Sequence, residues 1–392
     1  MVSSKLNPIA VGLLGMMLTP AAVFADNDNT ANASKIQQSA VAESATNEQS
    51  SLVPNLKENQ APLTVNKGNF VAAPIPFSNP TIDSGLAGLV GYFYPQTNEQ
   101  KAIQPPSVTG VAGFYSSNDS WGAAVGHASY WDNNNWHLKG GIAYADLKLP
   151  LVSTEFIGLP IAVDWDITGY GALLELERRI SGNWFVGING IFIDFEQDFN
   201  VDISSIHFDL NNEIVSAGLG AGIIYDSRDV PTNPYEGYYF KLNGTVFNDA
   251  IGSDNNFESY SLEFDGYFPV HESVTVAYKL KGCMKEGDVP LWAACRLGLR
   301  GFSSTEYMAL GSIETEAEAR WRFHKRWGLV GFVGAGKLDD VNHTDKSNDI
   351  IPSYGIGLRF MLQPAERINL RLDYARSSNN NSAIYFSVGE AF

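Results

Sequence analysis

The sequence predicts an all-β fold, a transmembrane antiparallel β-barrel of about 16 strands. The first observation is its ending: Ile384, Phe386, Val388 and the terminal Phe392 are expected on one face of a last strand. An unpaired strand edge is tolerated where it closes a barrel, and closed barrels and helices are the only structures that satisfy all backbone groups in lipid. The second is composition: 12% aromatic and only 18% charged residues, against about 25% charged in soluble domains.

The amino-terminal 67 residues differ from the rest of the chain. Residues 1–25 combine Lys5, an apolar run over 9–18 and the small-residue end Val23-Phe24-Ala25, which predicts a cleaved signal peptide. The run is too short to span a bilayer. Residues 26–67 contain no aromatic residue and are rich in Ala, Ser, Asn and Gln, which predicts a flexible periplasmic segment. We expect one barrel domain over 68–392.

Charge and residue usage exclude several functional classes. The formal net charge is −17, which argues against a nucleic-acid partner. The six His are scattered without metal-ligand spacing. We therefore expect no cofactor, no metal site and no nucleic-acid binding.

Alternation of apolar and polar residues is the evidence for individual strands. It is clearest in the carboxy-terminal half, at 259–268, 274–281 and 368–374. Successive side chains of a strand point to opposite faces, so one face is apolar and the other charged. A soluble sandwich also alternates, but segments of about ten residues separated by turns are what a tilted membrane-spanning strand requires.

The connections between these segments fall into two classes. Short turns at 181–182, 269–272 and 324–325 are expected on the periplasmic side, and longer polar gaps at 150–164, 197–212, 282–311 and 338–352 on the outer surface. Aromatic residues near the short turns predict an interfacial girdle: Tyr94, Trp131, Trp136, Trp184, Tyr235, Tyr238, Trp321 and Trp327.

Two motifs are more specific than the strand pattern. Asp226, Arg228 and Asp229 precede Pro234 and Gly237 between two strands, a composition typical of a turn with local ion pairs. The second motif, Arg300-Gly301-Phe302, lies in the longest outer gap and is followed by Phe332-Val-Gly-Ala-Gly336. By itself, each is also compatible with an ordinary turn or loop.

In this order the motifs resemble the BamA/TamA superfamily of outer-membrane barrels, the bacterial surface antigen type. The region 74–88 resembles the first hairpin of that family, so the resemblance covers about 68–392. It implies a Gram-negative outer-membrane protein of membrane biogenesis or partner translocation, inserted by the outer-membrane machinery and serving an unidentified protein client. It also implies that the sixth surface loop folds into the lumen. Phe386 and Phe392 resemble the insertion signal of such barrels.

The resemblance implies that Arg300 of the sixth loop pairs with acids on the lumen wall, and the local sequence suits that arrangement. Glu314, Glu316 and Glu318 alternate with Thr315 and two Ala residues, so the three acids share the inward face. A bidentate pair with Glu316 or Glu318 would fix the loop tip. The family often has an Asp where this chain has Gly334, so the acids of this strand are expected to be the sole partners.

The only two cysteines, Cys283 and Cys295, lie in the same gap. In an exported chain such a pair is more often a disulfide than a metal site or nucleophile. We predict a disulfide that restrains the base of the sixth loop, with a stabilisation of about 3 kcal/mol in the chain-entropy model.

The family resemblance leaves the activity open. Residues 26–67 are too short for the POTRA domains of assembly proteins, so a barrel-only member is expected. The leading hypothesis is biogenesis or translocation through a weak seam between the first and last strands. The second is a passive pore, since the inward face carries charges of both signs: Lys241, Glu263, Lys279, Lys281, Arg359 and Arg371.

A remote third hypothesis is a lipid-modifying enzyme. His127 and Ser129 have the His-x-Ser spacing that places both side chains on one strand face, as in lipid A deacylases. No orienting acid can be named beside them, and we expect no enzymatic activity. Outer-membrane lipids and lipopolysaccharide are the expected surroundings.

Overall fold

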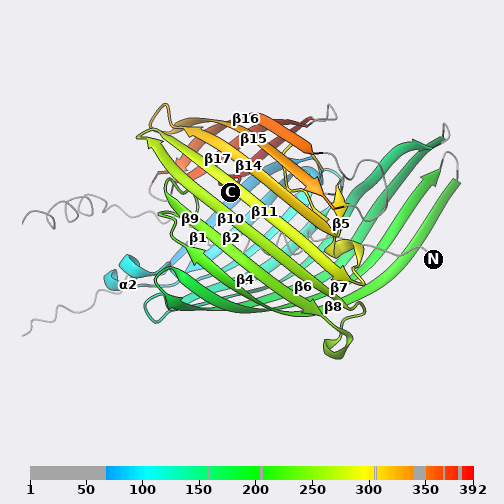
Figure 1. The fold of residues 1–392 in the computed structure, drawn as a ribbon, viewed down its shortest axis with the longest axis horizontal. Coiled ribbons are helices and arrows are strands. Elements are labelled where there is room, and N and C mark those ends of the chain that lie inside the picture. Colours follow the sequence, from blue (N-terminus) through cyan, green and yellow to red (C-terminus); the bar gives the residue numbers. More distant parts are fainter. Residues whose placement is uncertain are drawn as a thin grey trace, which may run out of the picture.

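Sixteen antiparallel strands close into one barrel in the computed structural model (Figure 1). It describes residues 68–156, 159–203, 206–303, 305, 307–339, 350–364, 367–377 and 382–392. The predicted signal peptide and periplasmic segment, residues 1–67, lie outside the described residues. The predicted all-β barrel of about 16 strands is confirmed.

The first eight strands are β1 (Asn69–Asn79), β2 (Asp83–Phe93), β3 (Val108–Ser116), β4 (Trp121–Trp131), β5 (Trp136–Phe156), β6 (Leu159–Ser181), β7 (Trp184–Ile203) and β8 (Ile206–Asp226). The other eight are β9 (Gly237–Phe247), β10 (Phe257–His271), β11 (Val274–Gly287), β14 (Gly311–Trp321), β15 (Trp327–Leu338), β16 (Ile351–Gln363), β17 (Ile368–Ser377) and β18 (Ser382–Val388).

Short elements occupy three of the connections. The β2–β3 connection contains α2 (Asn98–Ile103), which Thr97 caps, and the β9–β10 connection contains η2 (Asp249–Ile251). The β11–β14 connection, which we call loop 6, holds η3 (Leu291–Ala293) and a small sheet of β12 (Cys295–Arg296) and β13 (Met308–Ala309). Within the described residues, every helix is too short or too polar to cross a membrane.

We call the end where β1 begins and β18 ends the terminal end, and the opposite end the loop end. Turns at the terminal end include 132–135, 182–183 and 272–273, whereas loop 6 lies at the loop end, where β15 also ends and β16 begins. Residues 340–349, in the predicted surface loop at 338–352, lie outside the described residues. The assignment of the sequence gaps at 150–164 and 197–212 to surface loops is wrong. β5 and β6 pair from Trp136 to Phe156, and β7 and β8 pair down to Ile203 and Ile206.

These four strands therefore project beyond their neighbours at the loop end, as the long green arms in Figure 1 show. Polar residues such as Asp164, Asn200 and Asp202 make these gaps resemble loops in the sequence. The backbone hydrogen bonds between paired strands do not depend on the side chains. A strand segment that does not contact lipid needs no apolar outward face, so polar residues are compatible with pairing there.

The two faces of the barrel wall differ in polarity as the alternation predicts. Large apolar side chains such as Leu86, Ile142, Leu219, Val333 and Ile356 are exposed on the outer face. The inner face near the loop end holds an apolar cluster around Trp165, Leu147 and Ile193, against which Trp292 of loop 6 packs. Further toward the terminal end, the inner face is charged.

The aromatic girdle has one member that lies elsewhere. Tyr94, Trp131, Trp184, Tyr238, Trp321 and Trp327 are exposed outer-face residues near the terminal end, and the half-buried Trp136 stacks on Trp131 there. Tyr235 instead lies in the β8–β9 turn, where its ring stacks between the guanidinium groups of Arg322 and Arg367. Its neighbours in space are cations from two other turns, which the sequence spacing did not indicate.

The seam between the first and last strands is the weakest junction among the described pairs. β1 pairs with β2 at all eleven of its residues but with β18 only at Ser78 and Phe386. β18 in turn pairs with β17 at all seven of its residues. The barrel is thus closed, with one lightly paired boundary.

Candidate functional site: a charged network around Arg300

The inner face of β14 carries a row of charges. Glu314, Glu316, Glu318 and Arg320 are each at most 5% exposed, while the alternate residues Ile313 and Trp321 are half exposed or more. Carboxylates in such a place need cationic partners, because burying an unpaired charge is costly.

Arg300 of loop 6 meets two of these acids. Its Nε and Nη2 donate to the two carboxylate oxygens of Glu316 at 3.2 and 2.7 Å, and Nη2 also donates to Glu318. The guanidinium carbon lies 3.4 Å from the centroid of the Phe332 ring on β15. This bidentate, stacked arrangement uses the planar geometry that distinguishes Arg from Lys.

A third carboxylate, Asp373 on β17, corrects the expectation that the β14 acids would be the sole partners. Arg300 Nη1 donates to Asp373 Oδ2 at 2.7 Å. Gly334, at the position where the family often has an acid, instead makes room for the loop: a Cβ there would lie 2.9 Å from Leu299 Cδ2. Gly336 likewise faces Leu297. The strand that lacks the acid therefore receives the apolar side of the loop.

Gly301 and Phe302 complete the tip. Gly301 has φ of +109°, a conformation suited to glycine, and its N–H donates to Tyr385 Oη of β18 at 2.8 Å. Phe302 packs in a cluster with Leu297, Leu299 and Ile351. The tip thus contacts residues from β14 through β18.

Two further arginines extend the network to the end of the chain. Arg320 Nε donates to Glu318 at 2.9 Å, and its Nη2 donates to the backbone oxygen of Phe392 at 2.8 Å. Arg359 on β16 donates to Asp373 and, through Nε, to Glu390 at 2.7 Å. The last residues of the chain are therefore tied to the acids that hold Arg300.

The placement of Phe392 differs from the sequence prediction. β18 ends at Val388, and Gly389 follows with φ of +98°, so the chain leaves the strand direction. The Phe392 ring lies 5.2 Å from Lys279 Nζ and 5.3 Å from the Arg320 guanidinium. Phe386 remains in the strand, but Phe392 does not share its face, because Lys279 and Arg320 contact its ring and Arg320 binds its backbone oxygen.

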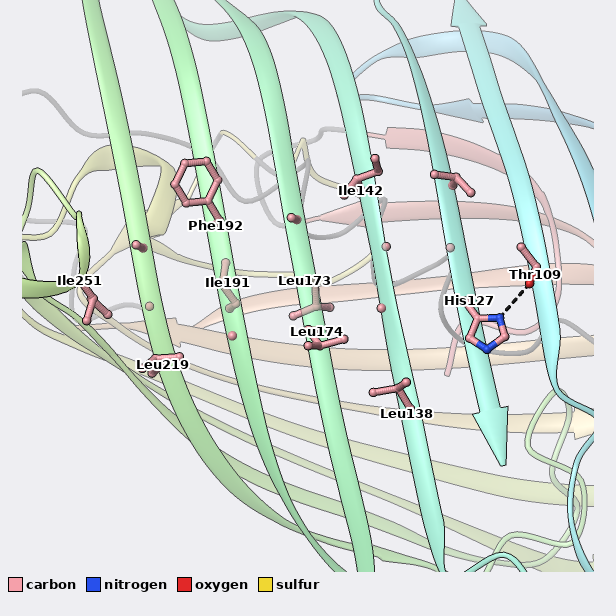
Figure 2. A pocket seen from close by; sticks show the side chains of 18 residues that line it. Thr109, His127, Leu138, Ile142, Leu173, Leu174, Ile191, Phe192, Leu219 and Ile251 are labelled. Carbon is pink, nitrogen blue, oxygen red and sulfur yellow. Dashed lines mark hydrogen bonds between the residues drawn. The ribbon is translucent and has the colours of Figure 1, made fainter. Parts of the chain in front are cut away.

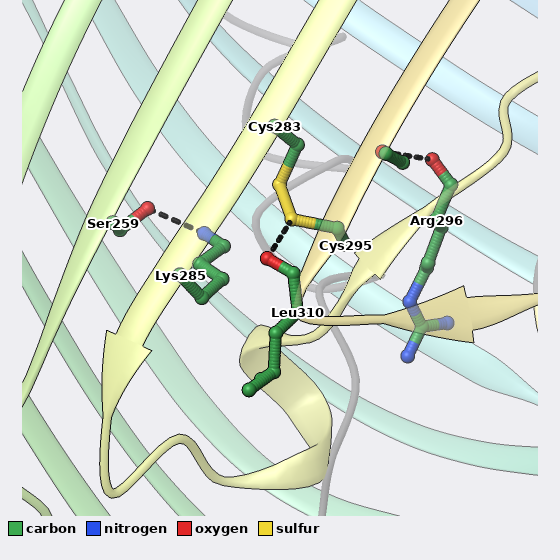
Figure 3. Close-up of a disulfide and its surroundings, with 7 residues drawn as sticks. Ser259, Cys283, Lys285, Cys295, Arg296 and Leu310 are labelled. Carbon is green, nitrogen blue, oxygen red and sulfur yellow. Dashed lines mark hydrogen bonds between the residues drawn. A yellow bond between two sulfur atoms is a disulfide. The ribbon is translucent and has the colours of Figure 1, made fainter. Parts of the chain in front are cut away.

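Loop 6 is also attached at its base. Cys283 at the end of β11 and Cys295 of β12 form a disulfide with an S–S distance of 2.03 Å (Figure 3). Trp292 Nε1 donates to Ser216 Oγ of β8 at 3.2 Å, and the indole packs edge-on against Phe247 and Phe257. The loop thus contacts the β8–β10 wall as well as β14–β18.

We predict that replacing both cysteines by serine will lower the free energy of unfolding by about 3 kcal/mol, the loop-closure value for a short covalent loop. The disulfide spans a sequence separation of 12 residues. Urea unfolding in detergent, monitored by tryptophan fluorescence, measures the change. Mass spectrometry of non-reduced wild type should detect no free thiol; two alkylated thiols would refute the bond.

The Asp226–Gly237 motif forms the β8–β9 turn at the terminal end. Arg228 makes a bidentate pair with Asp226, at 2.9 and 2.8 Å. Asp229 accepts from the Tyr235 N–H at 3.0 Å and pairs with Arg367, which lies in the β16–β17 turn. The Asp229–Arg367 pair therefore joins the β8–β9 turn to the β16–β17 turn, which is distant in the sequence.

Two residues shape that turn. A Cβ at Gly237, whose φ is +106°, would lie 2.3 Å from the Ser227 carbonyl oxygen, so the close approach requires glycine. Pro234 is buried, and the preceding Asn233 donates through Nδ2 to the Arg367 carbonyl at 3.1 Å. The motif is thus a bridge between turns rather than an isolated turn.

The Asp229–Arg367 pair predicts a dependence of stability on pH. Partial burial raises the pKa of the Asp229 carboxyl. Hydrogen bonds from Arg367 and the Tyr235 N–H lower it by a larger amount, so the pKa lies below its usual value. The stabilisation is therefore present above the unfolded-state pKa of about 3.9 and is lost as pH falls through the folded-state pKa.

We expect Asp229→Asn to have a lower Tm than wild type at neutral pH, with the difference vanishing below both pKa values. Thermal scans in detergent across this pH range measure it. Glu236→Gln, an exposed carboxyl of the same turn, is the matched control. A Tm difference for Asp229→Asn that does not change with pH would contradict the assignment.

His127 and Ser129 lie on the outer face of β4, since they alternate with the buried Ala128. His127 Nδ1 is hydrogen-bonded to Thr109 Oγ1 at 2.8 Å. Among the described residues, no hydrogen bond joins His127 to Ser129. The described residues also contain no cluster of three or more His, Cys, Asp or Glu suited to a metal ion.

Comparison with known proteins gives one family match. Residues 128–392 match the family model described as "Omp85 superfamily domain". No curated protein sequence matches the chain.

Solved structures share the fold. The chain is similar to BamA from Haemophilus ducreyi lacking POTRA domains 1–3, at 15% identity and TM-score 0.55, covering 83% of this chain and 70% of that one. It is also similar to CdiB from Acinetobacter baumannii (14%, TM-score 0.52, 83% and 60%) and CdiB from Escherichia coli (12%, TM-score 0.56, 81% and 62%). The chain thus spans about three fifths of each CdiB chain.

Proposed function

The chain belongs to the Omp85 superfamily and is an outer-membrane β-barrel, and we propose that it inserts or translocates a partner polypeptide through the seam between β1 and β18. This role follows the leading hypothesis from the sequence, outer-membrane biogenesis or translocation of a partner by a barrel-only member of the resembled superfamily. The substrate class is a polypeptide that presents a strand edge, and the terminal end, with its short turns, faces the periplasm.

The light pairing of the seam carries this proposal. A strand with unpaired N–H and C=O groups is a template for an incoming strand. β1 contains Pro74 and Pro76, which lack the N–H donor and are tolerated at sheet edges. Among the described strands, β1 and β18 share a single residue pair, Ser78 with Phe386, so opening here costs the fewest backbone hydrogen bonds.

The Arg300 network supports the same role, because it joins the wall on one side of the seam. Arg300, Arg320 and Arg359 link loop 6, β14, β16, β17 and the carboxy-terminal residues. We propose that the sixth loop, folded against the lumen wall, holds β14–β18 as one rigid unit while β1 moves. The Arg300 network is then a support for gating rather than a chemical site.

A passive pore has less support. The inner face at the loop end is packed with apolar side chains, including Trp292 of loop 6, and inward charges such as Lys241 and Lys281 are paired with Glu175 and Glu263. A catalytic role is not proposed either, since the His127 Nδ1 bond goes to Thr109.

A reversible cross-link across the seam tests the proposal. In Ser78→Cys/Phe386→Cys, oxidation should join β1 to β18 at their paired residues. The protein in phosphatidylethanolamine/phosphatidylglycerol vesicles is given a urea-denatured eight-stranded barrel as the probe client, and folding is followed by gel mobility. We expect acceleration by wild type, loss of acceleration in the oxidised variant, and recovery on reduction.

Ala72→Cys/Val90→Cys is the matched control, because it joins β1 to β2, which are already paired at those residues. Wild type treated with the same reductant is a second control, because it shows the effect of reducing the native Cys283–Cys295 disulfide alone. Undiminished acceleration by the oxidised seam variant would refute passage through the seam.

A further inference from the structure

An open groove of about 710 Å³ crosses the outer face of the barrel from β3 to β8 (Figure 2). Small residues form its floor on this face, Gly140, Ala172, Gly190 and Ala217. Larger side chains border it: Ile142 and Phe192 along one side, and Leu138, Leu174 and Leu219 along the other. The groove is separated from loop 6 by the barrel wall.

A polar cluster lies at the β3 end of this apolar groove. Thr109 Oγ1 is hydrogen-bonded to His127 Nδ1 at 2.8 Å and to Tyr94 Oη at 3.1 Å. His127 Nε2 has no hydrogen-bond partner among the described residues. A polar atom without a partner is costly against hydrocarbon, so this outward-facing histidine indicates a polar ligand group.

The dimensions of the groove match one acyl chain. It crosses six strands, or about 24 Å at the usual strand spacing. With a strand tilt of about 40°, that distance rises about 15 Å along the membrane normal, which is half the hydrocarbon core. Thr109 is next to the terminal end of β3, whereas Leu219 lies well inside β8. The groove therefore runs from the terminal rim across about half of the hydrocarbon core, and Ile251 of the β9–β10 connection borders its β8 end at the loop end.

We propose that the groove binds one glycerophospholipid of the leaflet at the terminal end. One acyl chain lies over Gly140 and Gly190, and the phosphate or ester oxygens accept hydrogen bonds from His127 and the neighbouring hydroxyls. The ligand is a phospholipid rather than lipopolysaccharide, because the polar cluster lies at the end opposite the surface loops. The inference goes beyond the proposed function and does not depend on the seam.

Native mass spectrometry of protein extracted from phosphatidylethanolamine/phosphatidylglycerol vesicles tests this site. Wild type should retain one phospholipid. Gly190→Leu should lose it, because a side chain at this position has room to enter the groove: a Cβ there meets only Leu219 Cδ2, at 3.7 Å. His127→Leu should weaken retention about 3- to 10-fold, the range for one hydrogen bond.

Gly331→Leu is the matched control, on the outer face of β15 with no atom within 4 Å of its added Cβ, and it should retain the lipid as wild type does. Heat-dependent gel mobility verifies that each variant is folded. A second arm adds purified lipopolysaccharide, which should not displace the phospholipid. Equal retention by wild type, Gly190→Leu and His127→Leu, or retention of lipopolysaccharide instead, would overturn the proposal.

Discussion

Replacing Arg300 by Met should lower the free energy of unfolding by about 3–5 kcal/mol, the cost of removing one partner from a buried ion pair. Glu318 would still have Arg320, and Asp373 would still have Arg359. Glu316, which is 1% exposed, would lose its only ion-pair partner in the described structure. The destabilisation should therefore arise mainly at Glu316.

A double-mutant cycle tests that attribution. Arg300→Met/Glu316→Gln should be more stable than Arg300→Met alone, because the orphaned charge is gone. Urea unfolding in detergent gives the stabilities, and chymotrypsin cleavage near Phe302 reports release of the tip. Arg178→Met is the control, an exposed cation stacked 5.1 Å from the Trp136 ring, and should change stability by less than about 1 kcal/mol.

If Arg300→Met were as stable and as protected from protease as wild type, the network would not hold the loop. A gain in stability for Glu316→Gln alone would point the same way. That result would mean that the Glu316 carboxylate destabilises the fold even when Arg300 is paired with it. Both outcomes are measurable without knowing the client.

The β14 part of this site was predictable because the family resemblance implied a partner for the loop arginine and local alternation placed the acids. Alternation along 314–320 puts Glu316 and Glu318 on one face with Arg320, and the Arg-Gly-Phe tip supplies the partner. The contact with Asp373 could not be predicted in this way, because Asp373 is 73 residues from Arg300 in the sequence. Its approach depends on the closure of β14 through β17 into a curved wall, which no spacing rule encodes.

The same limit explains the two errors of placement. Polar composition makes 150–164 and 197–212 resemble loops, although hairpin pairing continues through both segments. Phe392 was placed on the last strand by counting alternate residues, but Arg320 and Lys279 bind it after the chain bends at Gly389. Local patterns predict faces; they do not predict which distant cation a chain end will meet.

Removal of loop 6 should convert a poorly conducting barrel into an open one. Loop 6 contacts β8 through Trp292 and β17 through Arg300, and Thr305 Oγ1 donates to the Pro150 carbonyl of β5 at 2.7 Å. These contacts reach widely separated parts of the wall, and we propose on this basis that the loop extends across the lumen and leaves little space for water.

The variant replaces residues 289–309 by a short Gly/Ser linker and carries Cys283→Ser, so that no free thiol remains. In planar bilayers we expect small, flickering conductance from wild type and a several-fold larger, steady conductance from the variant. Arg300→Met, which frees the tip but retains the loop, should show an intermediate frequency of openings, and Arg178→Met should match wild type.

The ordering of these conductances separates the two hypotheses about function. A gated barrel needs a closed lumen in the resting state, because an open one would dissipate solute gradients across the outer membrane whenever no client is present. A large steady conductance from wild type would mean that the contacts of Trp292, Arg300 and Thr305 do not seal the lumen. The passive pore would then be the better description, with the lightly paired seam a structural feature and not a passage.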